Sequence, residues 1–337
     1  MKRKIVYLIL LAIYIPICAF GQAHTVSEIL DIIKHQEKHP HYTLVAAHRG
    51  YWANYPENSS EAFNSAISLG VDIVEMDVRL TNDDVMVVFH DACLDRVTTG
   101  NGRLRDANWA DVQKLNLRLS YGVPTSYKML SLDEALTLLK DKAVVSIDIK
   151  ETGSLFNTVL LRVINMLKGK NMLWQSIIKG KMPLAELEEL LHREDVTLDD
   201  FIYTPIAFSN TPDLDNYINS YVNTHKIYAF ELVYKQTADP ICKYVQLLQN
   251  NHIWVGQYSF WPETADGVFA EKNPLTDTDP VTRDYKFEDK NPNNFLDDGR
   301  GDWDWLMSLG ANYIITDRSE LMIEYLILRG LRSTSTY

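Results

Sequence analysis

The sequence predicts an α/β fold, a (β/α)8 TIM barrel with a small insertion after a β-hairpin. Extended segments rich in β-branched residues alternate eight times with amphipathic helical segments, which is the pattern of a parallel barrel surrounded by helices. The length of 337 residues suits one large domain of this kind, which we place at residues 40–330. A doubly wound open sheet would show the same alternation, so the strand count alone leaves that alternative open.

Runs of Val, Ile, Tyr and Thr bounded by turn residues mark the expected strands. These strands cover residues 43–48, 71–77, 144–149, 175–179, 200–204, 227–232, 253–258 and 312–317. Helical periodicity marks the expected helices, at residues 59–69, 131–140, 155–167, 183–192, 214–225, 239–250, 303–309 and 320–329. We interpret Asn58 and Glu61 as a capping box that begins the first helix, and Gly70 as its end.

One extended segment, residues 86–90, breaks the alternation because it follows the second strand with no room for a helix. It predicts a β-hairpin. A turn centred near Asp83 pairs residues whose numbers sum to about 166, so His90 would lie opposite Met76. This register would bring His90 beside the carboxylates of the second strand.

Three segments fall outside the regular elements. Residues 92–124 form the expected insertion, and residues 261–300 are a second long stretch rich in Asp, Asn and Pro. Loops of that length in a compact domain are usually functional or flexible. Residues 24–41, which precede the first strand and carry several histidines, are expected to be a solvated segment.

The N-terminus predicts a cleaved secretory signal peptide at residues 1–21. A basic start is followed by the apolar residues 5–20, and Ala19 and Gly21 provide the small residues of a cleavage site. The apolar run is short for a membrane span, so we expect a secreted or periplasmic protein without stable membrane insertion. Cys18 raises a lipoprotein alternative, but a large isoleucine precedes it where a lipobox needs a small residue.

Composition narrows the function classes. Hydrophobic residues make up 46% and charged residues 23% of the chain, which excludes a disordered protein. The 33 basic and 45 acidic residues give a net charge of −12, which argues against nucleic acid as a partner. Cys93 and Cys242, which remain after cleavage, favour two free thiols, although the compartment would permit one bridge.

Charged side chains gather where the expected strands end. Chemistry in such a barrel sits at the C-terminal ends of the strands. Glu75 and Asp77 are two residues apart and therefore share a face, as do Asp148 and Lys150. The candidate residues at this mouth are His48, Arg49, Glu75, Asp77, His90, Asp148, Lys150 and, from the fourth strand, Lys179. Glu231, near the end of the sixth strand, is a weaker candidate.

These residue types suit phosphodiester chemistry. Carboxylate oxygens favour a hard divalent cation, Ca²⁺ or Mg²⁺, whereas zinc would need more His or Cys ligands. Two histidines near such a cation could serve as general acid and base. Arg49 offers a fork of donors to a phosphate, and Lys150 a point charge. A small-molecule phosphodiester substrate is the corresponding prediction.

Six short motifs resemble the glycerophosphodiester phosphodiesterase family. They are HRG at 48–50, PENS at 56–59, EMDV at 75–78, VFHD at 88–91, LDRVTTGNG at 94–102 and IITDR at 314–318. The resemblance implies a (β/α)8 barrel with an insertion after the HD histidine. It also implies a divalent cation, and hydrolysis of glycerophosphodiesters to glycerol 3-phosphate and an alcohol.

The resemblance also assigns roles residue by residue. His48 and His90 match the acid/base pair, Glu75 and Asp77 match metal ligands, and Arg49 matches the phosphate-binding arginine. The third ligand and its neighbouring lysine would be Asp148 and Lys150, where the family usually has Glu in an E-x-K element. The segment at 253–257, IWVGQ, also departs from the Asn-containing strand end of the family.

Some roles and functions stay open at this level. Asn58 is expected to be a helix cap only, and Glu57 either supports Arg49 or contacts substrate. Lys179 is expected to bind phosphate because of its place at a strand end. One alternative function is a phospholipase-like enzyme that acts on intact phosphatidylinositol or sphingomyelin. Another is a non-catalytic module that binds phosphorylated ligands.

Overall fold

The computed structural model describes residues 24–119, 122–234, 239–259 and 303–332. The predicted signal peptide and the stretch at 261–300 lie outside the described residues.

Eight parallel strands close into a barrel. In chain order they are β1 (Leu44–Ala47), β2 (Ile73–Leu80), β4 (Val144–Ile149), β5 (Ser176–Gly180), β6 (Ile202–Phe208), β7 (Ala229–Val233), β8 (Trp254–Tyr258) and β9 (Tyr313–Thr316). The ring closes because β1 pairs in parallel with both β2 and β9. The predicted TIM barrel is therefore confirmed, and the open-sheet alternative is wrong.

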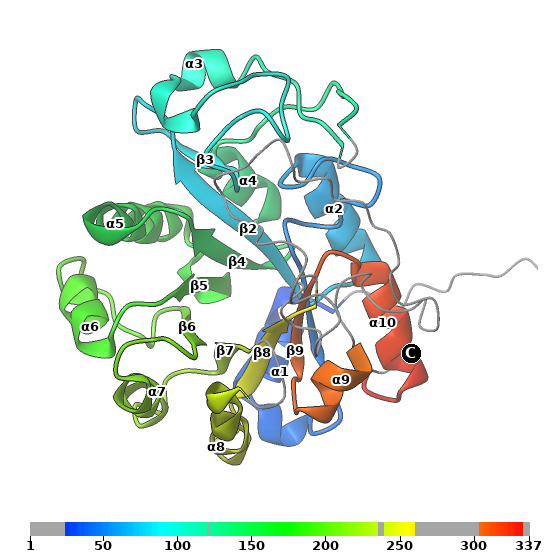
Figure 1. Ribbon diagram of the computed structural model, residues 1–337, viewed down its shortest axis with the longest axis vertical. Coiled ribbons are helices and arrows are strands. Elements are labelled where there is room, and N and C mark those ends of the chain that lie inside the picture. The colour runs from blue at the N-terminus through cyan, green and yellow to red at the C-terminus, as the bar shows by residue number, and fades with distance from the viewer. Residues whose placement is uncertain (1–23, 120–121, 235–238, 260–302, 333–337) are drawn as a thin grey trace, which may run out of the picture.

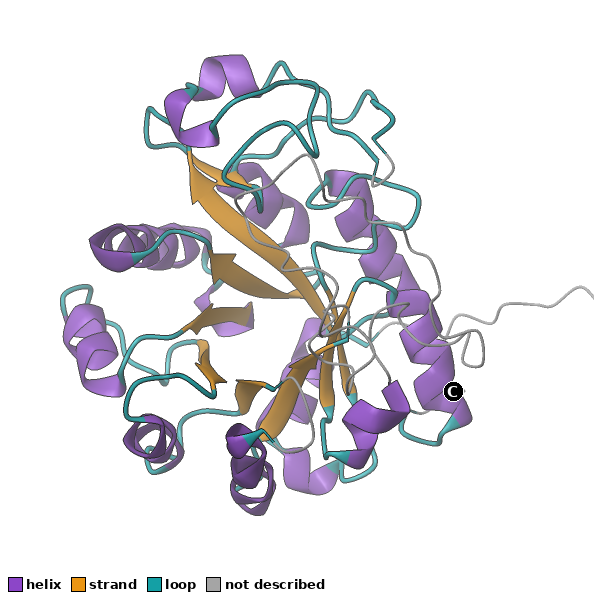
Figure 2. Cartoon of the chain, viewed as in Figure 1, coloured by secondary structure: helices purple, strands orange, loops and turns teal. Residues whose placement is uncertain are grey.

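Helices surround the strands (Figures 1 and 2). They are α2 (Ser60–Leu69), α4 (Leu132–Leu139), α5 (Gly153–Lys170), α6 (Leu184–His192), α7 (Leu214–Val222), α8 (Val245–Asn250), α9 (Trp303–Ser308) and α10 (Ser319–Leu328). Short 3-10 turns occur at Gln36–Lys38, Leu104–Asp106, Leu173–Gln175 and Pro240–Tyr244. Among the described residues, no helix is both long and apolar enough to cross a bilayer.

The two faces of a barrel strand carry different side chains: one face packs in the apolar core, and the other presents charged groups to the barrel interior. Along β2, Val74, Met76 and Val78 belong to the apolar layer that also contains the buried faces of the helices. Successive side chains of a strand point to opposite faces, so Glu75 and Asp77 point into the barrel. The carboxylates are thus held on a strand whose other face is fixed by core packing.

A helix at the N-terminus closes the bottom of the barrel. α1 (Val26–Lys34) begins at a capping box between Thr25 and Glu28, and it buries five apolar residues. These side chains pack with Leu44 and Ile73 from the N-terminal ends of the strands. The expectation of a solvated segment at residues 24–41 is therefore wrong, because one apolar face of this short helix covers the open end of the barrel.

The hairpin has the predicted register. β3 (Met86–Val88) runs antiparallel to β2, with Val78 opposite Val88 and Leu80 opposite Met86. The backbone N–H of Phe89 donates to the carbonyl of Asp77 at 3.0 Å, which extends the pairing toward the mouth. His90 is thereby delivered beside Asp77.

The insertion follows the hairpin and has an apolar core of its own. It contains α3 (Trp109–Val112) and continues until Ser131 caps α4. Its buried residues are Val87, Phe89, Leu94, Val97, Leu104, Val112, Leu117 and Met129. Since the hairpin contributes to this core, the insertion is packed firmly onto the rim of the barrel.

Candidate active site

Three carboxylates converge at the mouth of the barrel. Asp77 of β2 is the register partner of Asp148 of β4, and Glu75 lies one pleat below Asp77. Ligand oxygens of the three residues lie within 4.8 Å of one another. The predicted convergence is confirmed, and the shorter side chain of Asp148 still reaches the group because β2 and β4 are neighbours.

The donor set fits a divalent cation. Glu75 Oε1 and Asp77 Oδ1 are buried and accept no hydrogen bond. The ammonium groups of Lys179 and Lys150 lie 3.4 and 3.0 Å from them, and both oxygens keep lone pairs for a metal. Burial raises the pKa of Glu75 to about 7 in spite of the Lys179 ammonium, and the charges of Asp77 and Asp148 add to the rise. A hard cation with oxygen ligands would relieve this crowding of negative charge.

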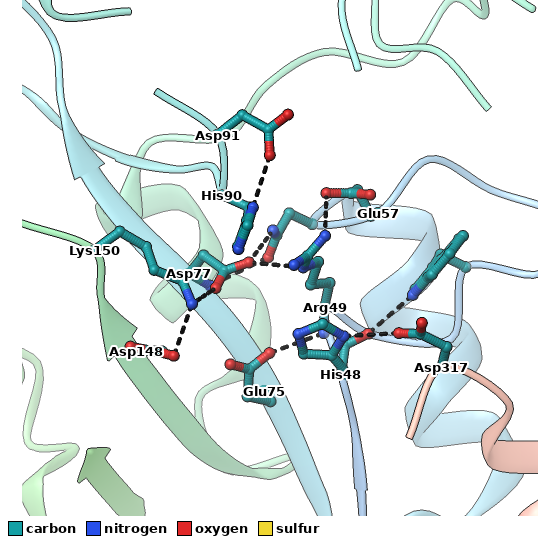
Figure 3. Close-up of polar contacts among 12 residues, drawn as sticks. His48, Arg49, Glu57, Glu75, Asp77, His90, Asp91, Asp148, Lys150 and Asp317 are labelled. Atoms are coloured by element: carbon teal, nitrogen blue, oxygen red, sulfur yellow. Dashed lines mark hydrogen bonds and ion pairs between the residues drawn. The ribbon is translucent and has the colours of Figure 1, made fainter. Parts of the chain in front are cut away.

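Two lysines lie among the carboxylates. The Lys150 ammonium is 2.8 Å from Asp148 Oδ2 and 3.0 Å from Asp77 Oδ1 (Figure 3). Although burial opposes ionisation of Asp77, Lys150 and Arg49 hold its pKa well below the usual range. Lys150 also lines the cavity at the mouth, so its charge faces both the carboxylates and the space where a substrate would enter.

Lys179 occupies a deeper position than its place at a strand end suggested. Its side chain is fully buried, and its ammonium is 3.4 Å from Glu75 Oε1 and 3.5 Å from Glu231 Oε1. The Tyr258 hydroxyl donates to the other oxygen of Glu231. Burial opposes the charge of Lys179, but Glu231, Tyr258 and Glu75 hold its pKa well above the usual range. Lys179 therefore balances the charge of the barrel interior.

We expect Lys179→Met to lower the free energy of unfolding by about 3–5 kcal/mol, because it leaves Glu75 and Glu231 buried without their counter-charge. Urea denaturation measures the change. The double variant Lys179→Met/Glu231→Gln removes one charge of each sign and should recover part of the loss. A single variant as stable as the parent would contradict this account.

His48 is held by a carboxylate from the far end of the chain. Its Nδ1 is 2.7 Å from Asp317 Oδ1, and both side chains are buried. β9 delivers Asp317 because Ala47 of β1 is paired with Thr316. Burial, followed by the charge of Arg49, holds the pKa of His48 well below its usual range. The neutral ring then donates from Nδ1 to Asp317, which leaves Nε2 for other contacts.

His90 has a similar arrangement with a neighbour in sequence. Its Nδ1 is 2.7 Å from Asp91 Oδ1, and burial lowers its pKa. His90 also lines a cavity of about 610 Å³ together with Asp148, Lys150 and Lys179. In Figure 3, His90 and His48 lie on two sides of the Arg49–Asp77 ion pair.

Comparison with known proteins bears directly on this site. The sequence profile of the Glycerophosphoryl diester phosphodiesterase family matches residues 48–199, which contain the two histidines and the three carboxylates. This segment of the chain is similar to that family. Asp317, the partner of His48, lies beyond the matched segment.

Relatives of the same name match part of the chain. A glycerophosphodiester phosphodiesterase from Caldanaerobacter subterraneus is 37% identical over 137 residues, which are 38% of this chain and 54% of the relative. One from Bacillus altitudinis is 33% identical over 115 residues, 34% of this chain and 47% of the relative. The matched part thus spans about half the length of these relatives.

Solved structures share the fold over most of the chain. A glycerophosphoryl diester phosphodiesterase from Parabacteroides distasonis has a TM-score of 0.67 and 19% identity, covering 94% of this chain and 96% of its own. An Oleispira antarctica phosphodiesterase, solved in complex with the product sn-glycerol-3-phosphate, has a TM-score of 0.57 and 15% identity. It covers 85% of this chain and 97% of its own. At these identities the likeness concerns the fold of the family.

Arg49 of the family's HRG motif is buried among carboxylates. Its Nη1 is 2.9 Å from Glu57 Oε1, and its Nε is 3.1 Å from Asp77 Oδ2. Its backbone N–H donates to Glu75 Oε2 at 2.9 Å. Arg49 has a positive φ of 58°, which is unfavourable for a residue with a side chain. This turn allows one residue to contact two of the predicted metal ligands.

Asn58 of the family's PENS motif supports Asp77 and does not cap the helix as predicted. Its side-chain amide donates to Asp77 Oδ2 at 2.9 Å. The N-cap of α2 is Ser59, whose hydroxyl accepts from the backbone N–H of Ala62. The predicted capping box is therefore wrong, because the adjacent serine performs the local task. Gly70 ends the helix in a left-handed conformation, as expected.

Two positioning carboxylates, Asp91 and Asp317, were not predicted from the sequence. Both lie in motifs that carried the family resemblance, HD and TD, but the resemblance assigned them no role. The position of Asp317 at the end of the last strand was the available signal, since that strand must pair with the first in a closed barrel. Glu57 supports Arg49, which was one of its two expected roles.

Proposed function

We propose that this protein is an exported, metal-dependent phosphodiesterase that hydrolyses glycerophosphodiesters to glycerol 3-phosphate and an alcohol. The observation that carries the proposal is the pair of histidines, each with Nδ1 engaged by a carboxylate, beside three converging carboxylates. A binding module would need no such acid/base pair. The names of the relatives support the same substrate class.

The residues of the mouth divide the chemistry among them. One of His48 and His90 takes the proton of the nucleophile, and the other protonates the leaving alcohol. Lys150 places positive charge beside the phosphoryl oxygens. Glu75, Asp77 and Asp148 would hold the divalent cation, Ca²⁺ or Mg²⁺, whose charge would stabilise the phosphate as it reacts.

A phospholipase-like enzyme would need an apolar rim around the mouth, where a bilayer could dock. Among the described residues, the exposed large hydrophobic side chains are Val123, Trp174 and Leu328. Trp174 precedes β5 and Leu328 ends α10, so both belong to the opposite end of the barrel. Val123 lies in the insertion at the rim, and the segments that follow β7 and β8 at the mouth lie outside the described residues, so the choice between a soluble diester and an intact phospholipid rests on an assay.

An activity assay on the mature chain, residues 22–337, tests the proposal. With Mg²⁺ or Ca²⁺ present, we expect glycerol 3-phosphate to be released from sn-glycero-3-phosphocholine and related soluble diesters. Turnover only on micellar phosphatidylinositol or sphingomyelin would favour the phospholipase alternative. Binding of glycerol 3-phosphate without turnover would favour the binding module. An N-terminus at Gln22 in protein recovered from a secreting host would support export.

A further inference from the structure

One guanidinium outside the barrel connects the carboxylate that contacts His90 with the carboxylate that contacts Arg49. Arg96 lies in the insertion, and its side chain is 7% exposed. Its Nε and Nη2 donate to the two oxygens of Asp91 at 2.6 and 2.9 Å. Its Nη1 and Nη2 donate to the two oxygens of Glu57 at 2.6 and 2.7 Å. Arg96 therefore binds two carboxylates at once, each through both oxygens.

Each of these carboxylates continues to a residue of the site. Asp91 Oδ1 is 2.7 Å from His90 Nδ1. Glu57 Oε1 accepts from Arg49 at 2.9 Å, and Arg49 in turn contacts Asp77. Figure 3 shows Asp91 above His90 on one side and Glu57 above Arg49 on the other. Arg96 is the group that bridges these two arms.

The charges explain why the bridge is needed. Asp91 and Glu57 are both buried, and two buried carboxylates side by side are unfavourable without paired cations. Although burial opposes ionisation, Arg49 and Arg96 lower the pKa of Glu57 to about 2. An ionised Asp91 can only accept, so His90 donates from Nδ1 and keeps Nε2 for proton transfer.

The insertion holds Arg96 in place. Leu94 and Val97, on either side of it, are buried in the apolar core of the insertion. The backbone N–H of Leu94 donates to the carbonyl of Gly102 at 2.8 Å, and that of Thr98 to the carbonyl of Leu94 at 3.0 Å. The guanidinium thus projects from a packed, hydrogen-bonded turn, so little conformational freedom remains to be lost.

We propose that Arg96 is a positioning residue for the proposed hydrolysis: it holds His90 in the reactive tautomer through Asp91 and orients Arg49 through Glu57. The inference rests on the proposed function for its kinetic consequence only. In this proposal, one function of the insertion is to hold Arg96 at the rim of the barrel. A lysine could not replace it, because an ammonium lacks the planar fork that binds two carboxylates.

Kinetics of four single variants and one double variant test the two arms. We expect Arg96→Met and Arg96→Lys each to lower kcat by about 10- to 100-fold, the usual effect of removing a group that orients a reacting residue. Asp91→Asn should lower mainly kcat, because Asp91 acts through His90. Glu57→Gln should raise mainly KM, because Glu57 acts through Arg49, the expected phosphate-binding residue. Adding Arg96→Met to Asp91→Asn should cost little more kcat, since both changes act on His90. Full additivity, or wild-type kcat in Arg96→Lys, would overturn the proposal.

The matched control is Arg118→Met. Arg118 lies in the same insertion and is partly buried, but it donates to the carbonyls of Thr98 and Gly122 and to no carboxylate of the site. It should retain wild-type kcat, even if it lowers thermal stability as much as Arg96→Met does. An equal loss of kcat in both variants would show that the insertion acts only through its stability.

The tautomer of His90 provides a test that does not depend on turnover. In ¹⁵N-histidine-labelled protein, with the His90 signals assigned from a His90→Gln sample, wild type should show a proton on Nδ1 alone. Arg96→Met should show both tautomers, and Arg118→Met should resemble wild type. An unchanged His90 signal in Arg96→Met would overturn the inference. A wild-type protein without phosphodiesterase activity but with the expected tautomers would overturn the proposed function alone.

Discussion

Replacing either histidine with alanine should lower kcat at least about 100-fold, because a positioned general acid or base contributes that much to proton transfer. His48 and His90 lie on two sides of Asp77 and Arg49 (Figure 3), so neither can perform the task of the other. The measurement is the rate of glycerol 3-phosphate release at saturating diester. Binding of the divalent cation, measured by calorimetry, should survive both substitutions, since neither histidine belongs to the carboxylate cluster.

His252→Ala is a suitable control for these variants. His252 is exposed and precedes β8 at the end of the barrel opposite the mouth, so kcat should not change. If His48→Ala kept full activity while Glu75→Ala lost it, the acid/base pair would be misassigned, and activation of water at the carboxylate cluster would explain the data better.

Removal of the divalent cation should have a still larger effect. We expect EDTA to lower turnover by at least about 10³-fold, because a cation that stabilises a phosphoryl group contributes several kcal/mol to a barrier and each 1.4 kcal/mol is tenfold. Readdition of Mg²⁺ or Ca²⁺ should restore activity and raise Tm, since the cation binds the folded state only. Activity that persists after exhaustive chelation would contradict a role for the cation.

Substitutions of Asp148 test most directly whether the carboxylate cluster binds the cation. Asp148→Asn should weaken cation binding at least about tenfold, because it removes one of three charged oxygen ligands. Asp148→Glu restores the residue usual in the family and should retain binding, since the side chain lies at the partly open mouth. Loss of binding in Asp148→Glu but not in Asp148→Asn would exclude Asp148 as a ligand.

Much of the barrel and the centre of the site follow from local patterns. A β-strand repeats every two residues, so Glu75 and Asp77 share a face wherever the strand lies. The hairpin register depends only on its turn, which is why His90 was correctly expected near Asp77. Three carboxylates from neighbouring strands converge for the same reason.

Only the tertiary structure decided which residues support those groups. His48 and Asp317 are 269 positions apart, and no local pattern links them before the barrel closes. Asn58 and Ser59 are both good helix caps, and the choice between them depends on Asp77, 19 positions away from Asn58. α1 is amphipathic by itself, but its apolar face has a partner only once eight strands leave an open end to cover. The sequence by itself determined the strands, the hairpin and the reactive groups, because these depend on neighbours along the chain. The partners that orient those groups depend on contacts made across the closed barrel.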